Sequence, residues 1–330
     1  MKHVVLGDGK AWLEDAPDPT PEGEWVVVKV TASPICGSDM HSYRHEGRHA
    51  GGGHEGVGEV VAVDAARHLR VGDRVLLNPA SGCGECWLCR QGDYIHCPNK
   101  PAGSGGHFAQ YVRKQEWLCP RLPDDLDDDL CSLMGCGLSP AFQALTRLGV
   151  TAFHTVLING LGPVGLGAVA LARFLGAQVI GVEPNPWRRD LAEQLGADLT
   201  LDPTASDALT LIRERTYGEG VHRAIDASGR PEGERLCIDA LRCLGKVAFI
   251  GENQGTIDFS PSRDGIRRGI EIITCWHQNL NSFDDLVTFL RRFSGARKTI
   301  SHTFGFTQVG QAFSTFASAQ AAKVVLHPWE

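Results

Sequence analysis

The sequence predicts a mixed α/β fold in which a doubly wound parallel sheet follows a β-rich, barrel-like domain. Three observations support this prediction. Short β-rich runs separated by Gly, Pro and Asp turns fill the chain up to about residue 137, strands and helices alternate between residues 155 and 275, and a glycine-rich turn joins the first strand and helix of that second part. Regular alternation with short connections is typical of parallel α/β sheets, and short strands with frequent turns are typical of compact β domains.

Length and composition narrow the class of protein. The chain has 330 residues, enough for about two domains. Its 42% hydrophobic and 22% charged residues are typical of a globular protein, and its net charge of −7 argues against a nucleic-acid partner, because phosphate binding needs a basic face. No apolar run reaches the roughly 18 residues that span a bilayer, and the amino terminus turns polar too soon for a signal peptide. We therefore expect no membrane partner and a cytoplasmic location.

The first domain is predicted over residues 1–137. Runs such as 25–30 and 58–63 consist mainly of valine and other strand formers, and turn residues interrupt them. The stretch 277–330 returns to mixed structure, and we expect it to pack on this first domain.

The second domain is predicted over residues 138–276. Apolar runs indicate buried strands, and the segments between them have helical composition. The strands are expected at 155–159, 178–182, 199–201, 223–227, 246–250 and 270–275, and the helices at 163–175, 188–195 and 207–215.

The turn after the first of these strands has the pattern G-x-G-x-x-G and predicts a dinucleotide site. Gly160 permits the tight turn, Gly162 lets a pyrophosphate approach the backbone, and Gly165 lets helix and strand pack closely. Pro163 and Val164 open the helix, whose N-terminal N–H groups attract phosphate. A strand before the turn and a helix after it make this pattern more specific than the glycines alone.

Glu183 ends the next strand and indicates which dinucleotide binds. Its carboxylate can accept hydrogen bonds from the adenosine ribose hydroxyls and would repel a 2′-phosphate, which favours NAD over NADP. Arg188 and Arg189 lie close by in the chain and keep NADP open, because an arginine can hold that phosphate. The alternative is a strand–turn–helix without nucleotide, in which Glu183 only caps the turn.

Four of the eleven cysteines form a compact C-x2-C-x2-C-x7-C pattern. Cys83, Cys86, Cys89 and Cys97 can place four thiolates around one ion, which predicts a closed, structural zinc site within residues 83–97. An iron–sulfur cluster is the main alternative, since it also uses four cysteines.

A second metal site is suggested by Cys36, His54 and Cys136. Two thiolates and one imidazole leave the fourth tetrahedral position open for water or a substrate oxygen, as a catalytic zinc requires. Each residue alone has a simpler explanation, since cysteines are often small buried side chains and a histidine can be a satisfied core residue. Only their combination favours a metal.

Five motifs occur in a fixed order: 36–41, 53–58, 83–97, 135–137 and 160–165. This pattern resembles the zinc-dependent medium-chain dehydrogenase/reductase family of alcohol and polyol dehydrogenases, over essentially the whole chain. The resemblance implies a GroES-like catalytic domain split by a Rossmann NAD-binding domain, one catalytic and one structural Zn²⁺, and a homodimer or homotetramer.

The resemblance also assigns roles around the catalytic zinc. Cys36, His54 and Cys136 match its ligands. Glu55 matches an acidic residue beside the metal that replaces water as a ligand in some members, and Asp39 matches a carboxylate that orients the histidine ligand.

Other matched residues move a proton or contact the cofactor. Ser38 matches the hydroxyl that receives the substrate proton, and His41 the histidine that passes it to solvent. His45 and His49 lie on the same loop and are alternatives for that last role. Lys323 begins the run that resembles the family's closing, cofactor-contacting strand.

The chain departs from the family in two segments that border the substrate cleft. Only 17 residues separate Cys36 from His54, and the segment after Cys97 is short. We therefore expect an enzyme with an open cleft that transfers a hydride between a secondary alcohol or polyol, sugars and cyclitols included, and NAD.

Three alternatives to this activity stay open. One is a threonine-type amino-alcohol dehydrogenase, for which the sequence alone does not place a carboxylate-binding group. The others are a non-catalytic, nucleotide-binding family member and a zinc-ribbon nucleic-acid binder.

Overall fold

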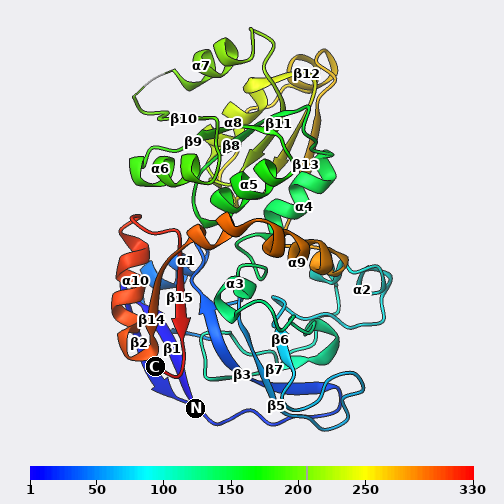
Figure 1. The fold of residues 1–330 in the computed structure, drawn as a ribbon, viewed down its shortest axis with the longest axis vertical. Helices are drawn as coiled ribbons and strands as arrows, with labels where there is room; N and C mark the ends of the chain where they lie inside the picture. Colours follow the sequence, from blue (N-terminus) through cyan, green and yellow to red (C-terminus); the bar gives the residue numbers. More distant parts are fainter. Residues whose placement is uncertain (206) are drawn as a thin grey trace. The chain divides into compact units, whose positions relative to one another are not determined.

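The computed structural model describes residues 1–205 and 207–330, and they form two compact units (Figure 1). One unit comprises Met1–Ser139 together with His277–Glu330, and the other comprises Pro140–Trp276. Among the described residues, no helix combines the length and the apolar character that crossing a bilayer requires.

The second unit is built on a six-stranded parallel sheet with the strand order β10-β9-β8-β11-β12-β13. This order runs outward in both directions from β8, which is the doubly wound topology that the alternating pattern predicted. The fold class is therefore confirmed. The strands are β8 (Thr155–Asn159), β9 (Gln178–Val182), β10 (Leu199–Leu201), β11 (Val221–Asp226), β12 (Leu241–Phe249) and β13 (Glu271–Thr274).

Helices cover this sheet, and local sequence sets their starts. Proline occupies the first turn of four of them, and the Asp207 carboxylate accepts a hydrogen bond from the Thr210 N–H at the start of the fifth. The helices are α4 (Ser139–Leu148), α5 (Pro163–Phe174), α6 (Pro186–Gln194), α7 (Ala208–Arg215) and α8 (Pro231–Ala240), followed by a π-helical turn η3 (Pro261–Ile266). Helix α8 has no counterpart among the predicted helices, and β12 begins five residues before the predicted strand.

The first unit contains two sheets. In the larger, β14-β15-β3-β5-β6 lie in that order and β7 also pairs with β3; in the smaller, the order is β2-β1-β4. The strands are β1 (Lys2–Gly7), β2 (Lys10–Asp15), β3 (Trp25–Pro34), β4 (His49–Ala50), β5 (Val57–Ala62), β6 (Arg74–Leu76), β7 (Tyr111–Gln115), β14 (Ile300–Gly305) and β15 (Lys323–His327).

Short helices connect these strands. They are α1 (Asp39–Arg44), α2 (Trp87–Arg90), α3 (Asp128–Ser132), α9 (Phe283–Arg292) and α10 (Val309–Ala317), with 3₁₀ turns η1 (Tyr94–His96), η2 (Glu116–Leu118), η4 (Leu280–Ser282), η5 (Ser294–Thr299) and η6 (Phe306–Gln308).

Strand β3 is the centre of the first unit. Val26, Val28 and Val30 alternate along it and are fully buried, so one face of the strand packs into the core. Its far end pairs antiparallel with β15, where Leu326 lies opposite Ser33. The end of the chain, red in Figure 1, therefore completes a sheet that residues near the start of the chain begin.

Polar contacts fix the segment 277–330 to the rest of this unit. The carboxylates of Asp125, Asp127 and Asp129 bond to the side chains of Arg291, Arg297 and His327, respectively. Asp127 also caps α3 through the Leu130 N–H. These three aspartates thus join the start of α3 to the segment 277–330.

We expect the His327–Asp129 contact, at 2.8 Å, to make stability depend on pH. The Asp129 carboxylate raises the pKa of His327, so this contribution is full below about pH 6.5 and is lost as the pH rises through the higher folded-state value. His327→Gln should lower the free energy of unfolding by up to about 1 kcal/mol at pH 6 and by less at pH 9, measured by urea titration. His302→Gln is the control, since His302 bonds to the Ser301 hydroxyl instead of a carboxylate. An equal loss at both pH values would contradict the assignment.

Candidate active site and structural metal centre

Four potential ligands from three separate segments meet in the first unit. Cys36 follows β3, His54 and Glu55 precede β5, and Cys136 lies in the turn after α3. One ligand atom of each lies within 4.8 Å of those of the others, and the Cys36 and Cys136 Sγ atoms are 3.8 Å apart.

The geometry and chemistry of this group fit zinc. Zn–S bonds of about 2.3 Å in a tetrahedron place two sulfurs about 3.8 Å apart. The contact with the Cys136 thiol holds the pKa of Cys36 well below its usual range, so one sulfur is already poised as a thiolate. Cys36, Cys136 and His54 can therefore hold Zn²⁺, with Glu55 beside them.

Asp39 shapes the loop that carries Cys36. Its Oδ2 accepts a hydrogen bond of 2.8 Å from the Cys36 N–H, while its Oδ1 lies 3.9 Å from His54 Nδ1. Burial raises the pKa of Asp39 to about 6. The carboxylate therefore bonds directly to the cysteine loop, and it faces the histidine at ion-pair distance, longer than a hydrogen bond.

Glu55 is paired with Lys323, the first residue of β15. Both side chains are fully buried, and the Lys323 ammonium contacts Glu55 Oε1 and lies 3.4 Å from the Ile35 carbonyl oxygen. Burial opposes the charge on Lys323, but the Glu55 carboxylate and the neighbouring sulfurs outweigh it and raise the pKa of the lysine. The structure thus places Lys323 at the metal group, whereas its contact with a dinucleotide stays a prediction.

His277 is a neighbour of the metal group; its place after the last strand of the second domain suggested a role at the cofactor edge or in packing, and this contact was not predicted. Its ring lies edge-on to the His54 ring, with centroids 5.7 Å apart, and burial lowers its pKa to about 4. A positive φ of 54° at His277 turns the chain as it re-enters the first unit. No spacing in the sequence signals this, because the contact depends on how the returning segment packs.

The predicted relay residues lie at the start of α1 and beyond it. Ser38 and His41 are exposed, and the Ser38 hydroxyl makes no capping bond to the helix. The rings of His41, His45 and His49 form a row, with centroids 5.4 and 5.5 Å apart. The row does not single out one histidine, so all three stay candidates for passing a proton to solvent.

The other four cysteines form a separate group around α2. The ligand sulfurs of Cys83, Cys86, Cys89 and Cys97 all lie within 4.8 Å of one another, with contacts of 3.8 and 4.0 Å. Backbone N–H groups of Cys83 and Cys86 point at sulfurs of the group, as suits thiolates. These separations fit one tetrahedral Zn²⁺ better than a cluster whose thiolates bind different irons.

The glycine turn of the second unit has the shape that its pattern predicted. Gly160 has a φ of +82°, and a Cβ there would lie 2.7 Å from the Ser228 backbone nitrogen. A Cβ on Gly165 would lie 1.8 Å from the Gly160 carbonyl oxygen. Gly162 instead faces open space beside the first turn of α5, where Pro163 and Val164 lie, so a phosphate can approach these N–H groups.

Glu183 and the neighbouring arginines lie at the end of β9. The buried Glu183 carboxylate accepts hydrogen bonds from the N–H groups of Leu161 and Asn185, at 2.9 and 3.1 Å. The Glu183 carboxylate therefore holds the glycine turn in place through the Leu161 N–H. Burial lowers the pKa of Arg188, whose Nε has no hydrogen-bond partner among the described residues, while Arg189 bonds to the Glu183 carbonyl oxygen.

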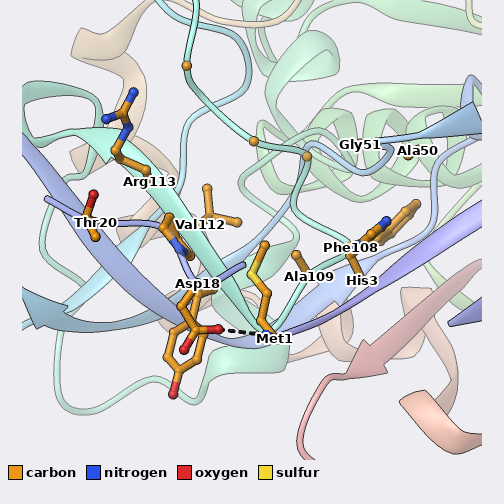
Figure 2. A pocket seen from close by; sticks show the side chains of 15 residues that line it. Met1, His3, Asp18, Thr20, Ala50, Gly51, Phe108, Ala109, Val112 and Arg113 are labelled. Atoms are coloured by element: carbon orange, nitrogen blue, oxygen red, sulfur yellow. Dashed lines mark hydrogen bonds and ion pairs between the residues drawn. The ribbon is translucent and has the colours of Figure 1, made fainter. Parts of the chain in front are cut away.

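Cavities open at several places in the first unit. One of about 620 Å³ is lined by Lys29, Arg74 and Trp329. Another, about 500 Å³, is lined by Met1, Asp18 and Arg113, with His3 and Phe108 at its other end (Figure 2). Its charges are balanced, because the Met1 ammonium pairs with Asp18 at 2.7 Å and Arg113 pairs with a glutamate. A third, about 250 Å³, includes the candidate metal ligand His54 in its lining.

A doubly wound sheet with a glycine-rich turn, joined in one chain to a β domain with two zinc-type clusters, defines a metal-dependent dehydrogenase. The chain belongs to the zinc-type medium-chain alcohol dehydrogenase family. Residues 22–124 match the alcohol dehydrogenase GroES-like domain, and residues 163–292 match the zinc-binding dehydrogenase domain.

Individual relatives agree with this membership. The chain is 34% identical, over 99% of its length and 98% of the relative's, to the uncharacterized zinc-type alcohol dehydrogenase-like protein YphC of Escherichia coli K12. It is 31% identical to an L-threonine 3-dehydrogenase of Symbiobacterium thermophilum, over 99% and 97% of the two chains. Among solved structures, the alcohol dehydrogenase TADH of Thermus sp. ATN1 matches with a TM-score of 0.91 at 25% identity, over 99% of both chains.

We expect the purified protein to bind two zinc ions per chain, measured by plasma mass spectrometry. Cys36→Ser should retain one zinc and lose turnover while its melting temperature stays near that of the wild type, because only the open site is damaged. Cys97→Ser should also retain one zinc but melt at a lower temperature, because folding of the lobe depends on its metal. Cys243→Ser, which changes an exposed cysteine outside both groups, is the control. A Cys36→Ser protein that keeps two zincs and full turnover would refute the ligand assignment.

We expect Lys323→Met to destabilise the fold strongly, because it leaves the buried Glu55 carboxylate without its partner. The predicted loss is about 3–5 kcal/mol of unfolding free energy in urea titrations. Adding Glu55→Gln should restore much of it, since the uncompensated charge is removed. Lys10→Met, at an exposed position of β2, should change stability by less than about 0.5 kcal/mol. A small loss for Lys323→Met would mean that the pair does not stabilise the core.

Proposed function

We propose that the protein oxidises a secondary alcohol or polyol with NAD, and runs the reverse reduction, at the Cys36–His54–Cys136 group. The observation that carries this proposal is an open set of two thiols and one imidazole in a family of alcohol dehydrogenases. When bound, zinc supplies Lewis-acid polarisation of the alcohol oxygen, and NAD supplies the hydride acceptor.

The chain's own residues hold and orient the reacting groups. Asp39 fixes the Cys36 loop through its bond to the Cys36 N–H. Lys323 engages the Glu55 carboxylate, which supports leaving the fourth metal position to the substrate. His277 packs against His54 and excludes water from that side of the imidazole.

Proton transfer is assigned to the exposed α1 segment. The Ser38 hydroxyl accepts the proton that leaves the alcohol and gives up its own proton in the same step, and His41 takes up that proton and carries it toward solvent. An imidazole can accept and release a proton near neutral pH and therefore suits such a transfer. The row of His45 and His49 beyond His41 supports a path for the proton to bulk water.

NAD is favoured over NADP as the cofactor. The Glu183 carboxylate at the end of β9 would repel a 2′-phosphate, and Arg189 is bonded to backbone carbonyls and Asp202. Arg188 is the cation that leaves NADP as the second candidate.

We also propose a homodimer or homotetramer in a reducing, cytoplasmic compartment. Within the described residues, β13 pairs only with β12, so its other edge is available to a second copy. All eleven cysteines are free thiols, which suits such a compartment.

A threonine-type amino alcohol is the second candidate substrate. It is favoured by the similarity to L-threonine 3-dehydrogenases, which are named for a hydroxy amino acid. A neutral polyol, sugar or cyclitol is favoured by the short segments that border the cleft.

The test is absorbance at 340 nm during a screen of alcohols, polyols, sugars and amino alcohols with the zinc-loaded protein. We expect reduction of NAD with at least one secondary alcohol, at a kcat/KM about tenfold or more above that with NADP. Ser38→Ala should lower kcat by about a hundredfold, because one positioned proton acceptor is lost. Ser42→Ala, on the same helix, is the matched control. Failure of every alcohol with both cofactors would overturn the proposed function.

A further inference from the structure

The cavity of about 250 Å³ that includes His54 in its lining lies beside the candidate zinc group. Its polar side chains come from His54, Ser81, Lys100, Ser104 and His107, and most of the remaining lining is glycine and backbone of residues 101–106. Of these described lining residues, none is an aspartate or glutamate. Lys100 is therefore the one strong cation in a lining without acidic groups.

A second lysine stands directly behind this lining. Lys114 on β7 is completely buried, and its ammonium donates hydrogen bonds to the Ala80 carbonyl oxygen and, at 3.3 Å, to the Ser104 hydroxyl. Both acceptors belong to residues that line the cavity. Among the described residues, no ion pair joins Lys114 to a carboxylate; the titratable side chain that acts on its charge is the Cys119 thiol, which burial keeps neutral. Burial lowers the pKa of Lys114 to about 8.

Hydrogen bonding within the protein does not explain why a charged residue stands here. A neutral glutamine could donate to a carbonyl and a hydroxyl equally well, as Gln115 does to the Gly82 carbonyl oxygen. A buried ammonium without a counter-charge is unfavourable by several kcal/mol, and buried charges are normally paired. The other titratable residues of the cavity do not supply the counter-charge, since His107 accepts from the Gly56 N–H and burial keeps it neutral.

We propose that this cavity binds an anionic group of the substrate, so that the enzyme acts on a secondary alcohol bearing a carboxylate or a phosphate monoester near the hydroxyl carbon. The hydroxyl faces His54, and the anion lies against Lys100 and the Ser104 hydroxyl, with Lys114 polarising that hydroxyl from behind. This inference rests on the proposed alcohol oxidation and names its substrate class. It also supplies the carboxylate-binding group that the sequence alone did not place.

Turnover with matched pairs of substrates tests the proposal. The pairs are 3-hydroxybutyrate and 3-hydroxybutyramide for a carboxylate, glycerol 3-phosphate and glycerol for a phosphate, and L-threonine and L-threoninamide for the amino acid. We expect at least one anion to exceed its neutral partner about tenfold in kcat/KM, the factor of one charge-assisted hydrogen bond. The pair with the larger ratio identifies the anion. If all three neutral substrates are oxidised with the same kcat/KM as their anionic partners, the proposal is overturned, while the alcohol dehydrogenase activity stands.

Substitution of the two lysines tests whether they cause the preference for anionic substrates. Lys100→Met should raise KM for the preferred anion about tenfold and affect its neutral partner much less. Lys114→Gln keeps two hydrogen-bond donors and removes the uncompensated charge, so it should melt at or above the temperature of the wild type and lower the preference in the same direction. Lys10→Met is the control for loss of one surface charge. Equal effects of Lys100→Met on both members of a pair would refute the assignment.

Binding without turnover keeps the two proposals separate. Calorimetric titration of the zinc-loaded protein with 3-hydroxybutyrate, 3-hydroxybutyramide and inorganic phosphate should show tighter binding of the anions, lost in Lys100→Met. If no alcohol is oxidised but this difference is seen, the oxidation proposal fails and the anion site stands. If the anions bind no better than the amide, the anion site is overturned whatever the turnover.

Discussion

The first unit depends on one constraint: two cysteine sulfurs and one histidine imidazole must be held close to one another. Cys36, His54 and Cys136 are far apart in the sequence, yet their ligand atoms lie within 4.8 Å of one another. Each segment is held from outside the group: the first by Asp39, the second by strand β5, and the third by α3 with its capped start. A metal that binds three such segments contributes directly to the free energy of folding, because the unfolded chain cannot present them together.

Buried charge is treated in two different ways around this group. Lys323 is neutralised by Glu55, so this pair belongs to the architecture and is complete in the chain alone. Lys114 is equally buried but bonds only to neutral oxygen atoms. Both ammonium groups lose their hydration on burial, and only the loss at Lys323 is compensated by a carboxylate. The cavity beside Lys114 is therefore suited to a ligand that completes the balance.

Most of the second unit could be predicted from the sequence. The strands at 155–159, 178–182 and 199–201 were predicted to the residue, because short buried runs bounded by turn residues have few other solutions. The helix 231–240 was missed, since charged residues interrupt its apolar positions, and β12 began early because its first residues pair with β11 through a register shift. For the site, the four-cysteine group was proposed from its spacing, and Cys36, His54 and Cys136 from their combination of residue types. The contact of His277 with His54 and the Lys323–Glu55 pair were not predicted, because both depend on the returning segment.

The sequence by itself determined the fold class, the glycine turn, the four-cysteine pattern and the candidate ligand set, because local spacing and residue chemistry limit what these segments can do. Only the tertiary structure decided which polar groups meet: Lys323 with Glu55, Asp39 with the Cys36 backbone, and Lys114, over residues 1–205 and 207–330, with no carboxylate. The reason is that pairing of strands β3 and β15 joins residues separated by most of the chain, and no local pattern encodes such a register.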